Sequence, residues 1–82
     1  MIDIDTPLKR CFISVFPALG GTDVTRAELT SVEGWDSIAT ATLLSVVCEE
    51  FDLPMDPDQT ESLTSYGGFR AWIVSRIREQ SD

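Results

Sequence analysis

Histidine and asparagine are both missing from this 82-residue chain, and each absence excludes a class of function. Histidine is the commonest general base and the commonest neutral metal ligand in proteins, so catalytic triads and histidine-rich zinc sites are excluded. Asparagine is the acceptor of Asn-linked glycosylation, so no such site exists here. Any reaction at a serine of this chain therefore has to be activated without a histidine of its own.

Cysteines and long apolar runs are also scarce. Cys11 and Cys48 are too few for a disulfide framework or a four-cysteine metal site, which favours a reducing compartment. The longest unbroken apolar run, residues 71–74, is far shorter than the roughly 18 residues of a membrane helix. The acidic N-terminus also lacks the basic start and apolar stretch of a signal peptide. We expect a cytoplasmic protein without a membrane span.

Basic residues are missing from the middle of the chain. Residues 27–69 hold no Lys or Arg, and the net charge of −8 arises there, because residues 1–26 are neutral and residues 70–82 carry +1. Such a field repels nucleic acid and attracts basic protein surfaces. We therefore expect basic protein partners and no nucleic acid, while an acidic surface that serves only solubility remains an alternative. The acids of this stretch are Glu28, Glu33, Asp36, Glu49, Glu50, Asp52, Asp56, Asp58 and Glu61.

Length and periodicity predict one domain over residues 1–82, beginning with an amphipathic helix. Apolar side chains recur at helical spacing from Leu8 to Leu19, and a helix over residues 6–18 would start at Asp5 or Thr6 as its cap. Pro17 should loosen the helix near its end. Residues 20–36 then predict a long ordered loop with a short helical turn around residues 26–29.

Residues 37–51 predict the best helix, with Asp36 and Ser37 both suitable as N-caps. One line of its side chains has the spacing of a buried face, with Glu50 at its edge. A second line lies about a quarter turn away and could form a shallow outward stripe, although a wide core face is an equal alternative. The first line is Leu43, Val46, Val47 and Phe51, and the second is Ile38, Ala41, Ser45 and Cys48.

The C-terminal third predicts a short helix over residues 58–63, with Pro57 at its start, and a last helix capped by Ser65. Trp72 lies one position off the apolar line of that last helix and should pack at its edge. The predicted fold is all-α, a small bundle of three main helices plus one short helix. Its core should include Phe12, Leu43, Val47, Phe51 and Ile73, and the last helix should bury Tyr66, Phe69, Ile73 and Ile77.

The remaining candidate for chemistry is the segment Gly34-Trp35-Asp36-Ser37-Ile38. The acids around residues 56–61 lack the glycine and ligand spacing of a calcium loop, and the acidic neighbours of Cys48 would raise its pKa, so we predict no metal site and two inert thiols. A serine nucleophile needs a base, and no histidine or suitably placed lysine supplies one for Ser37. Ser37 is then either a helix cap, worth about 1 kcal/mol, or a residue that another protein modifies.

These residues resemble the acyl carrier protein family, which includes the peptidyl carrier domains. The family has Asp-Ser-Leu or Asp-Ser-Ile at the start of its second helix, and Asp36-Ser37-Ile38 matches that pattern. The resemblance covers essentially the whole chain, including Glu49-Glu50-Phe51 near the end of the second helix and a short acidic third segment. The Gly-Trp-Asp-Ser form resembles free-standing carriers of specialised metabolism, such as polyketide or nonribosomal peptide synthesis, or of surface-polysaccharide pathways.

The resemblance implies that Ser37 carries a covalent 4′-phosphopantetheine, attached by a magnesium-dependent phosphopantetheinyl transferase. The thiol at the end of that arm would hold an acyl or aminoacyl group as a thioester, and the chain would shuttle this group between biosynthetic enzymes. The protein would be a monomeric carrier domain, not an enzyme, with no metal and no catalytic residue of its own. The cargo, the loading enzyme and membership of a larger synthase stay open.

The same resemblance implies which residues meet the partners. These partners are the transferase, an acyl- or aminoacyl-loading ligase or transferase, and downstream acyl-using enzymes with basic docking surfaces. Asp36 would also orient the modification site. The expected contact residues are Asp36, Ile38, Ala41, Cys48 and Glu49.

Two other functions compete with the carrier interpretation. An acidic helical adaptor would bind basic partners through the same helix without a prosthetic group. A very small hydrolase or transferase would use Ser37 as its nucleophile, and the missing base argues against it.

Overall fold

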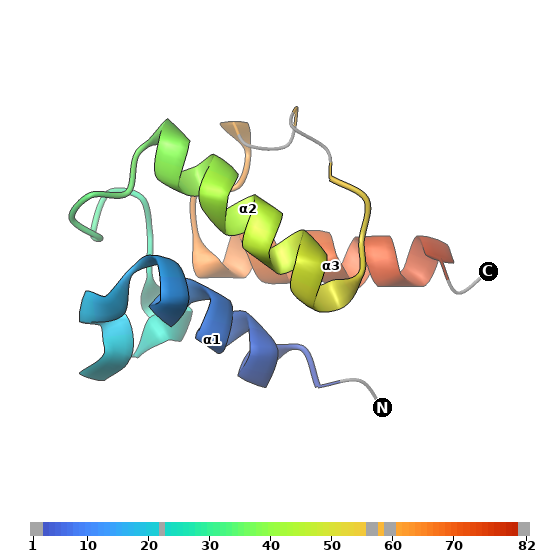
Figure 1. The fold of residues 1–82 in the computed structure, drawn as a ribbon, viewed down its shortest axis with the longest axis horizontal. Helices are drawn as coiled ribbons and strands as arrows, with labels where there is room; N and C mark the ends of the chain where they lie inside the picture. Colours follow the sequence, from blue (N-terminus) through green and yellow to red (C-terminus); the bar gives the residue numbers. More distant parts are fainter. Residues whose placement is uncertain (1–2, 22, 56–57, 59–60, 81–82) are drawn as a thin grey trace.

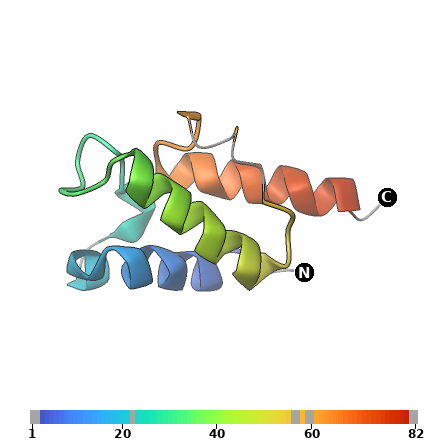
Figure 2. The same cartoon turned by 45° about the horizontal axis from the view of Figure 1, so that its top comes forward.

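The computed structural model describes residues 3–21, 23–55, 58 and 61–80, and these form an all-α fold. Its α-helices are α1 (Asp5–Val15), α2 (Ser37–Phe51) and α3 (Tyr66–Gln80). Figure 1 shows α1 and α3 running in opposite directions while α2 crosses them obliquely, and Figure 2 shows the same arrangement after a turn. The three predicted main helices are confirmed, and the described residues contain no β-strand.

Helix α1 begins and ends slightly earlier than the sequence predicts. The carboxylate of Asp3 accepts a hydrogen bond from the Thr6 amide at 3.2 Å, so Asp3 assists the start of the helix in place of Asp5 or Thr6. At the other end Phe16 leaves helical geometry, with φ −123° and ψ 79°. Pro17 disfavours helical geometry at the residue before it, and the chain continues as a 3₁₀-helix, η1 (Pro17–Gly21).

The loop before α2 is ordered by buried anchors and by backbone pairing with the start of α3. A second 3₁₀-helix, η2 (Val24–Arg26), is found just before the predicted turn and overlaps it only at Arg26. The Leu29 amide donates to the Thr64 carbonyl at 2.8 Å, and the Tyr66 amide donates to the Ala27 carbonyl at 2.9 Å. These bonds form an isolated antiparallel bridge between Glu28 and Ser65.

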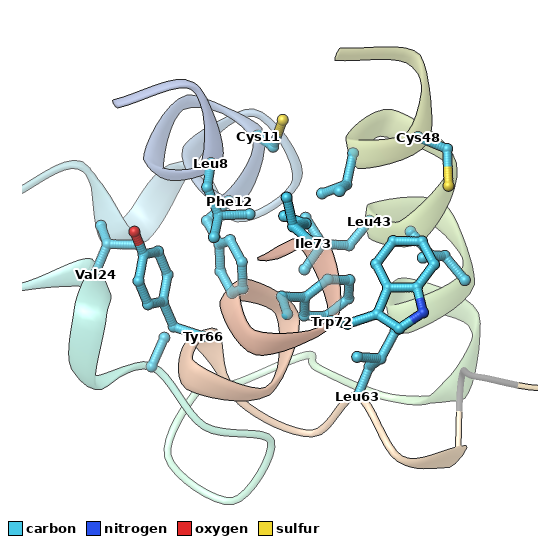
Figure 3. Packing of buried hydrophobic residues seen from close by; sticks show 14 of the residues in the cluster. Leu8, Cys11, Phe12, Val24, Leu43, Cys48, Leu63, Tyr66, Trp72 and Ile73 are labelled. Atoms are coloured by element: carbon cyan, nitrogen blue, oxygen red, sulfur yellow. The ribbon is translucent and has the colours of Figure 1, made fainter. Parts of the chain in front are cut away.

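The core is a cluster of aromatic and aliphatic side chains from all three helices. Phe12 is fully buried, and its ring centroid lies 5.2 Å from that of Tyr66 and 5.5 Å from that of Phe69. Figure 3 shows Phe12, Leu43 and Ile73 pointing toward one another from α1, α2 and α3. The prediction of a buried Phe12, Leu43, Val47, Ile73, Tyr66 and Phe69 is confirmed.

Three packing predictions need correction. Phe51 is only half-buried, because it is the last residue of α2 and the core covers one side of its ring. Ile77 is also half-buried, near the end of α3. Trp72 is buried rather than at the edge, and the Arg76 guanidinium lies 5.6 Å from its ring centroid.

The connection between α2 and α3 is described only in part. Asp58 and Glu61 have 3₁₀ geometry and Leu63 is buried, but residues 57, 59 and 60 of the predicted short helix and its start lie outside the described residues. Helix α3 begins after Ser65, whose hydroxyl accepts a hydrogen bond from the Gly68 amide at 3.0 Å, as a capping serine does.

An interaction between the start of α1 and the start of α3 joins residues that are 61 and 65 positions apart in the chain. The Asp5 carboxylate accepts hydrogen bonds from the Tyr66 hydroxyl at 2.7 Å and from the Arg70 guanidinium at 3.1 Å.

The longest described helices have 15 residues, and none of those described is long and apolar enough to cross a membrane.

Candidate functional site

The N-terminus of α2 is capped by Asp36 alone. Asp36 has extended backbone geometry, with φ −118° and ψ −172°, and its carboxylate accepts a hydrogen bond from the Ala39 amide at 2.8 Å. Its carbonyl oxygen accepts two more bonds, from the Thr40 amide at 2.9 Å and from the Thr40 hydroxyl at 3.0 Å. The carboxylate and the carbonyl of Asp36 are therefore both hydrogen-bonded to the first turn of the helix.

Ser37 is the first residue inside α2, and this corrects the prediction that it could be the cap. Its side chain is exposed, and its hydroxyl has no hydrogen-bond partner within residues 3–21, 23–55, 58 and 61–80. Since Asp36 performs the capping, the Ser37 hydroxyl has no structural task of that kind. It is accessible to an enzyme that would modify it.

The chain reaches this serine through a tight turn anchored by Trp35. Gly34 has a φ of +85°, a left-handed conformation that favours glycine. Trp35 follows and is buried, with its ring centroid 5.4 Å from that of Phe16 and 5.7 Å from that of Phe12. Its indole N–H donates to the Thr40 hydroxyl at 2.6 Å. The segment before Ser37 is thus fixed to the core.

The outward face of α2 is formed by Ile38, Thr42, Ser45 and Glu49, all of them exposed. Ile38 is the most exposed of the large hydrophobic residues described, at 76%. Ala41 lies at the edge of this face and is half-buried. Ile38 and Glu49 are exposed on this face, as the sequence predicts. Thr42 also lies on it and was missed, because the prediction followed one line of spacings and did not project every residue around the helix.

Cys48 does not belong to the outward face, and the predicted outward stripe is wrong at this residue. Only 6% of the residue is exposed, and its thiol lies 3.8 Å from the Pro54 carbonyl oxygen. Steps of three, four and three residues from Ile38 to Cys48 fall about 80° short of three full turns, so the line drifts around the helix toward the core. The alternative of a wide core face therefore holds for this end of α2.

Neither cysteine has the environment of a reactive thiol. Burial, together with the nearby Glu50 carboxylate, raises the pKa of the Cys11 thiol to about 11. Burial also raises the pKa of the Cys48 thiol above its ordinary value of 9.0. Both thiols stay protonated at neutral pH, and a thiol is a much weaker nucleophile than a thiolate. Within the described part of the chain, no cluster of acidic or cysteine side chains could hold a metal ion.

An apolar cleft of about 490 Å³ lies beside the first turn of α2. It is lined by residues 15–19 at the end of α1 and in η1, by residues 31–34 of the loop, and by Ala39. Among the described residues that line it, Glu33 is the one that carries a charge. Two apolar features therefore lie next to Ser37: the exposed Ile38, which follows it in the chain, and the cleft, whose lining includes Gly34 and Ala39.

Comparison of the chain with protein-family models finds no match, and comparisons with curated proteins and with solved structures also find none.

Proposed function

We propose that this protein is an acyl carrier protein that holds an acyl or aminoacyl group on a 4′-phosphopantetheine arm at Ser37. One observation carries the proposal: Asp36-Ser37-Ile38 stands at the start of α2 with the Ser37 hydroxyl exposed and not used in capping. That is the position at which the family resembled by this sequence carries its arm.

The residues at this corner fit such a group. An exposed hydroxyl leaves room for a phosphodiester, and the N-terminus of a 15-residue helix favours negatively charged phosphate oxygens. The Asp36 carboxylate is already engaged with the Ala39 amide, so it is held on the helix end beside the phosphate position. The arm would supply a terminal thiol that holds the cargo as a thioester. The chain itself would only attach, orient and present it.

The outward face of α2 supports docking to basic enzymes. Glu49 lies on that face with Ile38, and residues 27–69 contain no base that could neutralise it from within this stretch. Opposite charge raises association rates, and a small apolar contact adds orientation without tight binding. A carrier needs such a short-lived contact, because it must leave one enzyme to reach the next. The proposed contacts are Asp36, Ile38, Ala41 and Glu49, with Cys48 withdrawn.

In the proposed function the protein acts as a monomer in the cytoplasm. Cys11 and Cys48 are both free and buried, as expected of a chain that stays reduced. Its expected partners are a phosphopantetheinyl transferase, a loading ligase or transferase, and downstream acyl-using enzymes.

Modification by a broad-specificity phosphopantetheinyl transferase tests the proposal. With coenzyme A and Mg²⁺, intact-mass measurement should show the gain of one phosphopantetheine on the wild type and none on Ser37→Ala. The matched control is Ser75→Ala, an exposed serine of α3, which should be modified like the wild type. A wild type that several competent transferases leave unmodified contradicts the proposal and favours the acidic adaptor.

A further inference from the structure

Thr40 is the one buried polar side chain among the described residues, with 1% of it exposed. A buried hydroxyl is costly unless it is hydrogen-bonded. Here it is used on both sides: it accepts from the Trp35 indole N–H at 2.6 Å and donates to the Asp36 carbonyl at 3.0 Å. The fold therefore holds a continuous chain of hydrogen bonds directly beneath Ser37.

The Trp35 indole, which begins this chain of hydrogen bonds, is held in place by aromatic packing. The Trp35 ring contacts Phe12 and Phe16 of the α1 region, with centroids 5.7 and 5.4 Å away, and lies 6.5 Å from Phe69 of α3. Rings from two helices thus fix the position of the indole N–H. Through Thr40 they also fix the carbonyl of Asp36, the residue bonded to Ser37.

The chain of hydrogen bonds ends at Asp36, the residue directly before Ser37. The Asp36 carbonyl takes two hydrogen bonds from Thr40 and its carboxylate takes one from Ala39, so its backbone cannot turn without breaking them. The Ser37 hydroxyl, in contrast, is not tied to any described residue. The result is a rigid backbone that carries an unattached nucleophile.

We infer that the Trp35–Thr40 hydrogen bond is a positioning contact for the modification of Ser37, an inference that rests on the proposed carrier function. In that reaction the Ser37 oxygen forms a bond to the phosphorus that bears the pantetheine arm of coenzyme A. The bond from this phosphorus to the adenosine bisphosphate breaks, that group leaves with the electron pair, and the serine proton passes to a base of the transferase. The contact acts by holding the serine where its oxygen meets the phosphorus.

Loss of the contact should slow this step without weakening docking. A displacement of about 1 Å at a reacting group can cost roughly 100-fold in rate. A smaller displacement of the backbone at Asp36 and Ser37 should therefore cost about tenfold in kcat. Docking uses the exposed face of α2, which Thr40 and Trp35 do not reach. The KM for the carrier should therefore stay within about twofold.

Four variants and one control separate the hydrogen bond from packing. Thr40→Val removes the hydroxyl and Trp35→Phe removes the indole N–H, and each should lower kcat about tenfold. The double variant should be no slower than either single one, because both remove the same contact. Thr40→Ser keeps the hydroxyl and should restore kcat to within about threefold of the wild type. Thr25→Val is the matched control: it removes an exposed hydroxyl in η2 that bonds Asp23.

The outcomes distinguish this inference from the carrier proposal. A wild type that is not modified at all overturns both. If the wild type is modified and both single variants match Thr25→Val, the positioning inference alone is overturned. The inference also fails if Thr40→Ser is as slow as Thr40→Val, if the two single effects multiply in the double variant, or if KM rises while kcat stays constant. Circular dichroism confirms that each variant is folded at the assay temperature.

Discussion

The two ends of α2 have opposite roles in the fold. At the N-terminal end Ser37 and Ile38 are exposed, while Trp35 and Thr40 beneath them are buried and hydrogen-bonded to each other. At the C-terminal end the pattern turns around: Cys48 is buried, and the helix stops at Asp52 in a left-handed conformation with φ 53° and ψ 51°. One helix therefore exposes Ser37 and Ile38 at its first turn and turns Cys48 toward the core at its last turns.

The difference separates the exposed residues at the start of α2 from the buried residues that anchor them. The displayed groups at the N-terminal end are not the ones that hold it in place, because the anchoring is done by the buried Trp35 and Thr40. Substitutions in the exposed set should then change function with little effect on stability, whereas truncation of the buried set should also lower stability. The predictions below test this separation.

The largest expected effect comes from removing the anchor of the N-terminal end. Trp35→Ala should lower the free energy of unfolding by about 3–5 kcal/mol, because it removes a buried ring that packs on Phe12 and Phe16. Phe51→Ala, at the other end, should cost only about 1–2 kcal/mol, because that ring is half-buried. Urea unfolding measures both, and equal losses would show that the two ends are anchored alike.

A charge placed at each end should give the next largest difference. Cys48→Asp should cost about 2–3 kcal/mol, because the carboxylate would lose water at a site that is 6% exposed. Ile38→Asp should change stability by less than about 0.5 kcal/mol, because Ile38 is 76% exposed. Thermal unfolding compares the pair. A stable Cys48→Asp protein would return Cys48 to the surface and restore the original prediction of a stripe.

A smaller effect is expected from the hydrogen bonds of Asp5 in α1 with Tyr66 and Arg70 in α3. The Tyr66 hydroxyl, and then the Arg70 guanidinium, hold the pKa of the Asp5 carboxyl below its usual value of 3.8. A carboxyl whose pKa is lowered by folding stabilises the fold above its unfolded pKa, and this contribution is lost as the pH falls through the folded value. The melting temperature of the wild type should therefore fall more steeply below pH 4 than that of Asp5→Asn. Parallel curves would show that this interaction adds nothing.

The smallest effect on stability, and the most informative one for function, is expected at Glu49. Glu49→Lys should change stability by less than about 0.5 kcal/mol, yet it should slow acyl transfer with a cognate enzyme several-fold and flatten its dependence on salt. Ile38→Ser should slow the same transfer by loss of apolar contact. Glu79→Lys makes the same change of net charge on α3 and serves as the control, at a residue that is paired with Arg76. Equal effects at Glu49 and Glu79 would mean that only net charge matters.

The sequence was sufficient where the local signals agree. Residues 37–51 have a capping aspartate and a regular apolar spacing, and α2 spans those residues. Pro17 likewise marks the end of α1, although η1 continues the chain for five more residues. Such boundaries depend on backbone chemistry within a few residues, which a sequence displays directly.

The errors and omissions arose where packing around a helix, which the spacing of residues does not display, decides the outcome. Thr40 has the sequence environment of any helical threonine, and its burial depends on the Trp35 indole that meets it and on the aromatic rings around that indole. Trp72 is buried because the core extends around α3 beyond the predicted line. The direction of Cys48 depends on a drift of about 80° that a list of spacings conceals.

The bridge between Glu28 and Ser65 has a consequence for the order of folding. The 36 residues between these two positions include all of α2, and closing a loop of that length costs roughly 3 kcal/mol of chain entropy. The hydrogen bonds within α1, α2 and α3 join residues only four apart in the chain and can form before this loop closes. We therefore expect the bonds from Leu29 to Thr64 and from Tyr66 to Ala27 to form late, so that substitutions beside them accelerate unfolding and leave the folding rate almost unchanged.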